Sequence, residues 1–186
     1  MNCFPLCIYL AGAPVLLVGS GPQIREKQEK ILPFGPDLRV LDSLEEKDLE
    51  CQPALVIIGD LDRRSAEQYS GLCRQRGIPV NVVDTPELCT FFFPALIQRG
   101  DLTVSISTGG KSPGFSACLR KRLETQIPQR SGEILNWLNQ LRSALKPKFS
   151  KNARGSILRT AAEQSLSRGR PLSNEELDEI LQEDSV

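Results

Sequence analysis

The stretch Pro14-Val-Leu-Leu-Val-Gly-Ser-Gly21 decides the fold class of this 186-residue chain. Its first part, residues 14–18, is an apolar run of strand length, and Gly19-Ser20-Gly21 closes it. A polar stretch follows in which Ile24 and Ile31 supply an inward face at helical spacing. A strand that turns through glycines into a helix is typical of the first unit of a parallel α/β sheet.

Three further apolar runs lie at residues 38–41, 54–58 and 80–83, and a helical stretch over 65–76 separates the last two. Strands that are apolar throughout and alternate with helices indicate a parallel sheet buried on both faces. We therefore expect an α/β fold with a doubly wound parallel sheet.

The second half of the sequence changes character. Residues 102–107 predict one more strand, and Ser112-Pro113 is a good helix start because serine caps and proline fits the first turn. From about residue 129 the pattern is helical only, and Ser173-Asn-Glu-Glu176 predicts a capping box for a last short helix. An apolar stripe in the helical part is expected at Leu135, Leu138, Leu141 and Leu145.

The net charge of zero hides an uneven distribution. Residues 96–155 carry 11 Lys and Arg against 3 Asp and Glu, while residues 1–95 and 156–186 are each acidic by four charges. The basic block is either a solvated helix face that pairs with acidic helices or a surface that attracts a polyanion. An aromatic content of 5% offers few stacking platforms, which argues against nucleic acid as the partner.

Composition also restricts the chemistry and the compartment. The chain has no histidine, so we expect no metal site, and acid–base chemistry falls to other side chains. Its six cysteines form no C-x-x-C pair and are expected to be reduced and mostly buried thiols. No apolar run approaches the roughly 20 residues that span a bilayer, and the first residues lack a signal-peptide pattern. We expect a cytoplasmic protein with no membrane partner.

The glycine turn is a candidate nucleotide site. Glycines at a strand–helix junction let the backbone approach a pyrophosphate, which the helix N-terminus stabilises. Asp42, 23 residues after Gly19, lies where a carboxylate binds a ribose. Ile24 occupies the position of the usual third small residue, so the helix must move outward or repack. The alternative interpretation is an ordinary turn followed by a surface aspartate.

Two other stretches could carry chemistry. Asp84 comes just past a strand, at the edge where open α/β sheets bind ligands, and is the candidate for proton transfer. The alternative is that Asp84 is only a turn residue or helix cap. Residues 107–112 combine hydroxyls, glycines and a lysine before a capped helix, which favours an anion cradle over a flexible connector.

Several of these stretches resemble the precorrin-2 dehydrogenase module of the siroheme-synthase family. The matching segments are Phe4-Pro-Leu, residues 15–21, residues 77–89 with Asn81-Val-Val-Asp84, Phe93-Pro-Ala, and residues 99–113 with Ser107-Thr-Gly-Gly-Lys-Ser-Pro113. The likeness covers roughly residues 4–130 and is strongest over 77–123.

The resemblance implies a Rossmann-like NAD-binding domain over residues 1–93, a dimerisation segment over 94–128 and a small helical domain over 129–186. It implies a homodimeric enzyme that oxidises precorrin-2 to sirohydrochlorin with NAD as cofactor. Two alternatives stay open. One is a sirohydrochlorin ferrochelatase, alone or as a second activity, with ferrous iron as its other substrate. The other is a non-catalytic tetrapyrrole-binding protein that has lost its NAD site.

The resemblance also implies roles for individual residues. Asp84 matches the family's acid–base aspartate. The residues expected to bind NAD are Gly19, Ser20, Gly21, Pro22, Gln23, Asp42, Gly59 and Asp60. The residues expected to bind the substrate, which carries eight carboxylates, are Arg99, Ser107, Thr108, Gly109, Gly110, Lys111, Ser112 and Arg120.

The chain departs from the family in its cofactor half. Ile24 replaces an alanine, and a threonine is lost from the loop that reads Gly59-Asp60-Leu61-Asp62 here. Between Asp42 and Ala54 the chain is about 20 residues shorter than is typical of the family, and we expect a helix and a strand to be missing there. We therefore expect a trimmed NAD-binding domain beside an intact tetrapyrrole half.

Overall fold

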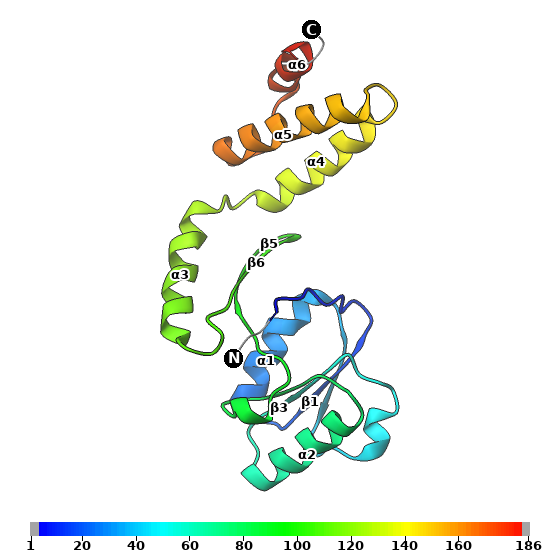
Figure 1. Cartoon of the computed structure of the whole chain (residues 1–186), viewed down its shortest axis with the longest axis vertical. Helices are drawn as coiled ribbons and strands as arrows, with labels where there is room; N and C mark the ends of the chain where they lie inside the picture. Colours follow the sequence, from blue (N-terminus) through cyan, green and yellow to red (C-terminus); the bar gives the residue numbers. More distant parts are fainter. Residues whose placement is uncertain (1–3, 184–186) are drawn as a thin grey trace. The chain divides into compact units, whose positions relative to one another are not determined.

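The computed structural model describes residues 4–183. Within this range the chain divides into two compact units, Phe4–Phe93 and the part from Pro94 onward (Figure 1).

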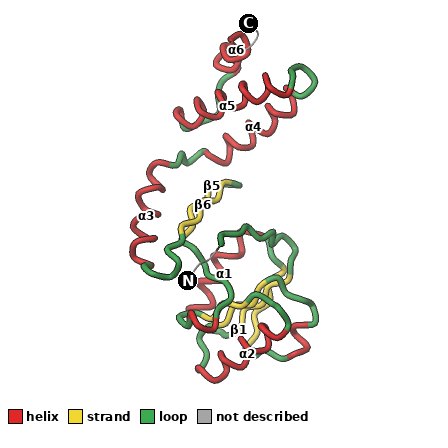
Figure 2. Tube along the Cα trace, in the orientation of Figure 1, coloured by secondary structure: helices red, strands yellow, loops and turns green. Residues whose placement is uncertain are grey.

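The first unit is built on a four-stranded parallel sheet (Figure 2). Its strands are β1 (Pro14–Val18), β2 (Asp37–Leu41), β3 (Leu55–Ile58) and β4 (Val80–Val82). Their spatial order is β2-β1-β3-β4, and every neighbouring pair is parallel. The predicted doubly wound sheet is confirmed.

Helices α1 (Pro22–Ile31) and α2 (Arg63–Gln75) lie on opposite faces of this sheet (Figure 1). Alternate residues of β1 therefore enter different cores: Leu16 packs in the cluster on the α2 side, and Leu17 in the cluster on the α1 side. Successive side chains of a strand point to opposite faces, so both faces require apolar residues. This explains why β1 and β3 are apolar throughout.

Strand β2, at one edge of the sheet, is the exception, because none of its residues is buried. Only a short 3₁₀ turn, η2 (Glu46–Leu49), connects it to β3, and Val40 on this strand is 49% exposed. The order β2-β1-β3-β4 is that of a doubly wound sheet without the strand that would lie outside β2. The shortening expected between Asp42 and Ala54 thus leaves one edge of the sheet uncovered.

The second unit begins with an antiparallel hairpin of β5 (Ala95–Arg99) and β6 (Leu102–Ile106). Strand β6 was predicted from the sequence, whereas β5 was not anticipated. The hairpin turns at Gly100, whose φ of +61° suits glycine, and a methyl group there would lie 2.9 Å from Gly132 Cα. A side chain at position 100 would therefore push the turn away from the helix that contains Gly132.

The rest of this unit is helical, as predicted, with α3 (Pro113–Gln126), α4 (Ser131–Leu145), α5 (Lys151–Arg168) and α6 (Asn174–Glu183). Ser112 caps α3 by accepting a hydrogen bond from the Phe115 amide at 3.2 Å. Leu141 and Leu145 are buried in the core that α4, α5 and α6 share, but Leu135 is 38% exposed. The expected stripe is wrong at this end, where Ile134 is the buried residue.

The capping box at the start of α6 is also confirmed. The Ser173 amide donates to the Glu176 carboxylate at 2.7 Å, and the Glu176 amide donates to Ser173 Oγ at 3.2 Å. Hydrogen bonds from Arg170, followed by the Ser173 amide, lower the pKa of Glu176 to about 2. Glu176 also pairs with Arg168 at 2.9 Å. This acidic residue of α6 therefore pairs with the end of α5 and the loop after it, outside the basic block.

None of the helices in residues 4–183 combines the length and apolarity needed to cross a membrane.

Gly19 should tolerate no side chain, since its φ is +119° and a methyl group would overlap the carbonyl oxygen of Gly59. We expect Gly19→Ala to lower the free energy of unfolding by more than about 2 kcal/mol, measured by urea denaturation. Gly71→Ala in α2 is the matched control, because open space surrounds that position. It should stabilise the protein by about 0.5–1 kcal/mol, and equal effects of the two changes would show that Gly19 is not sterically required.

Candidate functional site

The candidate site lies where β1, β3 and β4 end at the carboxyl edge of the parallel sheet. Two turns meet there, the β1–α1 turn at Gly19 and the β3–α2 turn at Gly59. The Gly19 amide donates to the Leu41 carbonyl at 2.8 Å, and the Gly59 amide donates to the Val18 carbonyl at 3.0 Å. Because a methyl group on Gly19 would overlap the Gly59 carbonyl, the backbones approach to a distance that only glycine allows.

Asp42 follows the last residue of β2, and its position relative to the glycine turn follows from the sheet register. Leu41 is paired with Val18, so Asp42 comes next to Gly19 along the neighbouring strand. Asp42 is exposed. This is the register that a carboxylate for a ribose hydroxyl requires.

The structure accommodates Ile24, at the position of the usual third small residue, by packing its side chain into the core. Its side chain is 1% exposed and lies in the core beneath α1. A methyl group on Gly19 would lie 3.3 Å from Ile24 Cγ1, and one on Gly59 would lie 3.3 Å from Ile24 Cδ1. The two glycines therefore leave the space that the larger side chain of the helix occupies.

Asp60 places its carboxylate at the N-terminus of α1. The Ile24 amide donates to Asp60 Oδ2 at 3.0 Å, and a methyl group on Gly21 would overlap the Asp60 carboxyl group. The backbone of Asp60 is left-handed, with φ of +56°. Amides at a helix N-terminus bind anions, and here the anion is a side chain of the chain itself.

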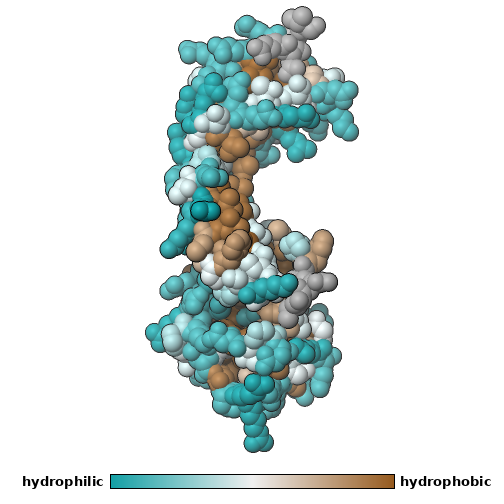
Figure 3. Space-filling view, turned by 60° about the vertical axis from the view of Figure 1, so that its left-hand side comes forward, coloured by the Kyte–Doolittle hydropathy of each residue, from teal (hydrophilic) through white to brown (hydrophobic). Residues whose placement is uncertain are grey.

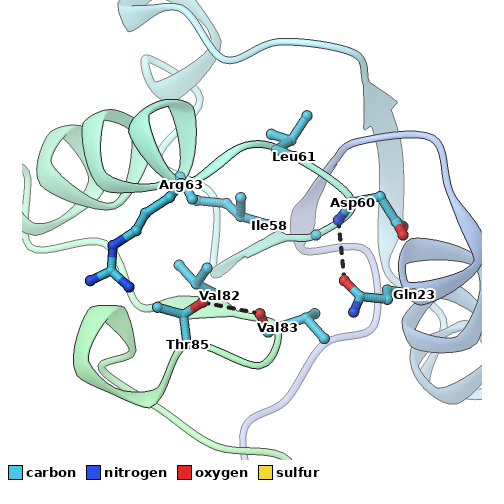
Figure 4. Close-up of a pocket in the computed structure, with 10 residues that line it drawn as sticks. Gln23, Ile58, Asp60, Leu61, Arg63, Val82, Val83 and Thr85 are labelled. Atoms are coloured by element: carbon cyan, nitrogen blue, oxygen red, sulfur yellow. Dashed lines mark hydrogen bonds between the residues drawn. The ribbon is translucent and has the colours of Figure 1, made fainter.

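Gln23 joins Asp60 to Asp84. Its Nε2 donates to Asp84 Oδ2 at 2.8 Å. Its Oε1 accepts a hydrogen bond from the Asp60 amide at 3.2 Å (Figure 4). Asp84 follows β4, is exposed, and has a left-handed backbone with φ of +58°. The predicted acid–base residue and the predicted cofactor turn are thus brought together by one amide side chain.

The segment after Asp84 accepts hydrogen bonds from the backbone of β4. The Val80 amide donates to Thr90 Oγ1 at 2.8 Å, and the Val82 amide donates to Cys89 Sγ at 3.2 Å. Burial raises the pKa of the Cys89 thiol, so it stays a neutral thiol near neutral pH. These bonds hold the turn that presents Asp84.

A pocket of about 360 Å³ opens between these turns (Figure 4). Gln23, Gly59 and Asp60 line one part of it, and Thr85 and Arg63 line another. Arg63 pairs with Glu67 at 2.8 Å and Glu87 at 3.2 Å, which raises the pKa of its guanidinium.

Arg63 and Thr85 were not among the site residues predicted from the sequence. Their positions in the sequence could have indicated them, because each lies within three residues of a predicted site residue. Gln23 was predicted to bind the cofactor but not to be the partner of Asp84, because 61 residues separate the two.

The predicted anion cradle lies in the other unit. Its hydroxyls close the loop on itself, because Ser107 Oγ accepts from the Gly109 amide and Thr108 Oγ1 accepts from the Ser112 amide, both at 3.2 Å. Gly109 and Gly110 are left-handed, and Lys111 is exposed. The loop is therefore an ordered turn that presents a lysine side chain to its surroundings.

Arg99 and Arg120 were expected to meet an anionic substrate, and in the structure both contact Glu124. Arg120 lies 2.9 Å and Arg99 lies 3.5 Å from a carboxylate oxygen of that residue. The Arg99 side chain is only 16% exposed. One carboxylate thus offsets part of the charge of both guanidiniums, and their substrate role stays a prediction.

The expectation for the cysteines is only partly met. Cys7, Cys51, Cys73, Cys89 and Cys118 are free thiols. However, only Cys73 among them is fully buried, where burial raises its pKa to about 11, whereas Cys7, Cys51 and Cys118 are exposed. Within residues 4–183, no group of His, Cys, Asp and Glu could hold a metal ion.

Comparison with known families matches the chain to two family models. Residues 42–95 match a model described as "Putative NAD(P)-binding", and residues 99–126 match "Sirohaem biosynthesis protein central". The first match supports a nicotinamide dinucleotide as the cofactor of this chain.

Relatives of known sequence are siroheme synthases. The chain is 33% identical over 170 residues to the siroheme synthase of Psychrobacter sp. (strain PRwf-1), covering 80% of this chain and 35% of that protein. It is 34% identical over 167 residues to that of Ectopseudomonas mendocina (strain ymp), covering 80% and 36%. The chain therefore spans about a third of the length of these curated relatives. The resemblance found in the sequence is confirmed.

Among solved structures, the fold is similar to that of SirC, a precorrin-2 dehydrogenase, with a TM-score of 0.69 and 19% sequence identity. The match covers 98% of this chain and 99% of that one. The Rossmann-like class of the first unit and the order of elements after it are thus those of a known fold.

Proposed function

Because the chain is related in sequence to the siroheme synthases over four-fifths of its length, we propose that it is an NAD-dependent dehydrogenase that oxidises precorrin-2 to sirohydrochlorin. The observation that carries the proposal is the Asp60–Gln23–Asp84 arrangement. It holds an Asp84 carboxylate oxygen 2.8 Å from the Gln23 side chain in the first turn of α1, at the edge where such sheets bind dinucleotides.

The residues present fit a dinucleotide. A side chain at Gly19 would overlap the Gly59 carbonyl oxygen, and one at Gly21 would overlap the Asp60 carboxylate, so both positions require glycine. A glycine turn at a helix N-terminus is the arrangement that binds a diphosphate. The residues that would hold the cofactor are Gly19, Ser20, Gly21, Pro22, Gln23, Asp42 and Gly59, whereas Asp60, which was also predicted to bind it, already occupies the helix N-terminus with its own carboxylate. The carboxylate of Asp42 favours NAD, since it binds a ribose hydroxyl and would repel a 2′-phosphate.

When bound, the nicotinamide would accept a hydride from the macrocycle. Dehydrogenation also releases a proton, and Asp84 would take it. Gln23 donates to one oxygen of this carboxylate and so fixes its orientation. The bonds from β4 to Thr90 and Cys89 fix the turn. The substrate's carboxylates would meet Lys111 and the residues predicted around it.

Asp84→Asn is expected to reduce precorrin-2 turnover by about 10²-fold or more, because the amide cannot accept the proton. Asparagine tolerates a left-handed backbone, so the variant should fold normally. Anaerobic incubation with precorrin-2 and NAD, followed by product absorption, measures the rate.

The control for Asp84 is Glu87→Gln, which removes an exposed carboxylate three residues away and should leave turnover within about twofold. Full activity of Asp84→Asn would remove Asp84 from the mechanism.

The cofactor's diphosphate must compete with the Asp60 carboxylate for the N-terminus of α1. Asp60→Asn removes one negative charge from that position and should tighten NAD binding by about three- to tenfold, measured by calorimetry. Asp62→Asn is the matched control, since Asp62 caps α2 in the same loop and asparagine is an equally good cap. Weaker NAD binding by Asp60→Asn would contradict this view of the site.

The same carboxylate favours a second candidate function. A chain with a filled anion site and an uncovered β2 edge could bind a tetrapyrrole without catalysis. NAD titration separates the two functions: binding at tens of micromolar supports the dehydrogenase, and none in the millimolar range supports the carrier.

A ferrochelatase activity at the same site is the remaining alternative. Asp84 would then accept pyrrole protons as ferrous iron enters sirohydrochlorin. An iron-insertion assay with sirohydrochlorin tests it directly.

The cytoplasmic location is part of the same proposal and is supported by the free thiols of the described cysteines.

We propose in addition that the protein is a homodimer through the segment formed by β5, β6 and α3. None of the 14 residues of α3 is buried, and Phe115 on it is 63% exposed. Figure 3 shows hydrophobic surface gathered over the middle of the chain. A two-stranded hairpin is marginal alone, and a second copy would cover its face.

Phe115→Glu should weaken the dimer by about tenfold or more in sedimentation experiments, because it places a charge in the proposed interface. Leu166→Glu on α5 is the matched control, with a similarly exposed apolar side chain at 61%. A monomeric wild-type protein at micromolar concentration would overturn the proposed dimer.

A further inference from the structure

A groove of about 540 Å³ lies between α4 and α5, within the second unit. Its lining comes from one face of each helix. The α4 side contributes Asn139, Arg142, Ser143 and Lys146, and helix α5 contributes Lys151, Arg154, Gly155 and Leu158. Each set has the spacing i, i+3, i+4, i+7, which places its members along a single helical face.

The lining carries four cations and no carboxylate. The surrounding sequence extends this imbalance, because residues 134–162 contain six Lys and Arg and no Asp or Glu. Among the side chains that the structure describes, no ion pair joins Arg142, Lys146, Lys151 or Arg154 to an acidic residue. The contact found there is a 3.4 Å hydrogen bond from Arg154 Nη1 to the carbonyl oxygen of Lys146.

The helix dipole favours the positions of only two of these four cations. Arg142 and Lys146 lie at the end of α4, where cations are favoured by the helix dipole. Lys151 and Arg154 lie in the first turn of α5, where the dipole disfavours them, and that turn contains no acidic residue. Four mutually repelling cations around one hollow therefore reduce the stability of the unliganded unit.

Gly155 contributes no side chain to the groove lining. It lies inside α5, where glycine costs about 0.5–1 kcal/mol relative to alanine. A methyl group there would have no neighbour within 4 Å, so close packing does not require the glycine. Its effect is to leave this exposed position of the groove lining without a side chain.

We propose that this groove binds a ligand with several carboxylates. Arg142 and Arg154 offer planar guanidiniums for paired hydrogen bonds with carboxylates, and Lys146 and Lys151 add point charges. The binding site follows from the groove alone. The identity of its natural ligand rests on the proposed function, since precorrin-2, with eight carboxylates, belongs to the class of ligand that the groove would take. Arg99 and Arg120 are less available to such a ligand, because Glu124 partly neutralises both.

The experiment is calorimetric titration of the full-length protein with mellitate (benzenehexacarboxylate) at low salt, about 50 mM, where screening is weak. We expect saturable binding to the wild type, and binding weakened about tenfold or more in the double variant Lys151→Gln/Arg154→Gln. Gly155→Leu keeps all four charges but places a large side chain in the groove lining, and it should weaken binding to a similar extent.

The control is Lys121→Gln/Arg122→Gln, which removes two cations of α3 outside the groove and should leave mellitate affinity unchanged. Thermal unfolding of every variant verifies that it is folded. Pyrophosphate forms a second arm: if it binds in the groove and mellitate does not, the assignment to carboxylates is wrong. Equal loss of affinity in the α3 control, or no mellitate binding by the wild type, would also overturn it.

The same variants separate this inference from the proposed function. NAD affinity of the groove variants should equal that of the wild type, because the groove and the glycine turn belong to different units. Mellitate binding without precorrin-2 turnover would reject the dehydrogenase and keep the groove. Normal precorrin-2 turnover with an unchanged KM in both groove variants would reject the groove as a substrate site and keep the enzyme.

Discussion

The close approach of the backbones at Gly19 and Gly59 is the constraint on which the candidate site depends. Because neither turn carries a Cβ at this contact, Ile24 fills the core below it and the two turns stay close together. The same approach brings Gln23 within reach of both Asp60 and Asp84. A bulkier residue at either glycine would separate the three side chains and with them the chemistry assigned to the site.

Much of the fold could be predicted from the sequence because its signals are local. The apolar run before Gly19 and the alternation of strands and helices predict a parallel sheet. Serine caps predict the starts of α3 and α6. The strand β5 was missed because its residues carry no such signal, and it is defined by pairing with β6. Likewise, Leu135 fits the helical period, but tertiary packing buries Ile134 in preference.

The site was predictable residue by residue but not as an arrangement. Spacing and the family resemblance identified Asp84, Gln23 and Asp60, yet no local pattern predicts a hydrogen bond between residues 23 and 84. The sequence also could not show which basic side chains form ion pairs with acidic residues. The basic block was evident, but only the structure separates Arg99 and Arg120, which meet Glu124, from the four cations of the α4–α5 groove.

The uncovered edge of β2 has a consequence for how the protein behaves in a crowded solution. An unpaired strand edge presents backbone amides and carbonyls that can recruit a strand from another molecule, which is a common route to aggregation. Asp37 and Arg39, both exposed on this strand and 3.4 Å apart, put opposite charges along that edge. A strand from another molecule would have to remove water from both charged groups before it could pair, so these two side chains oppose pairing at the uncovered edge.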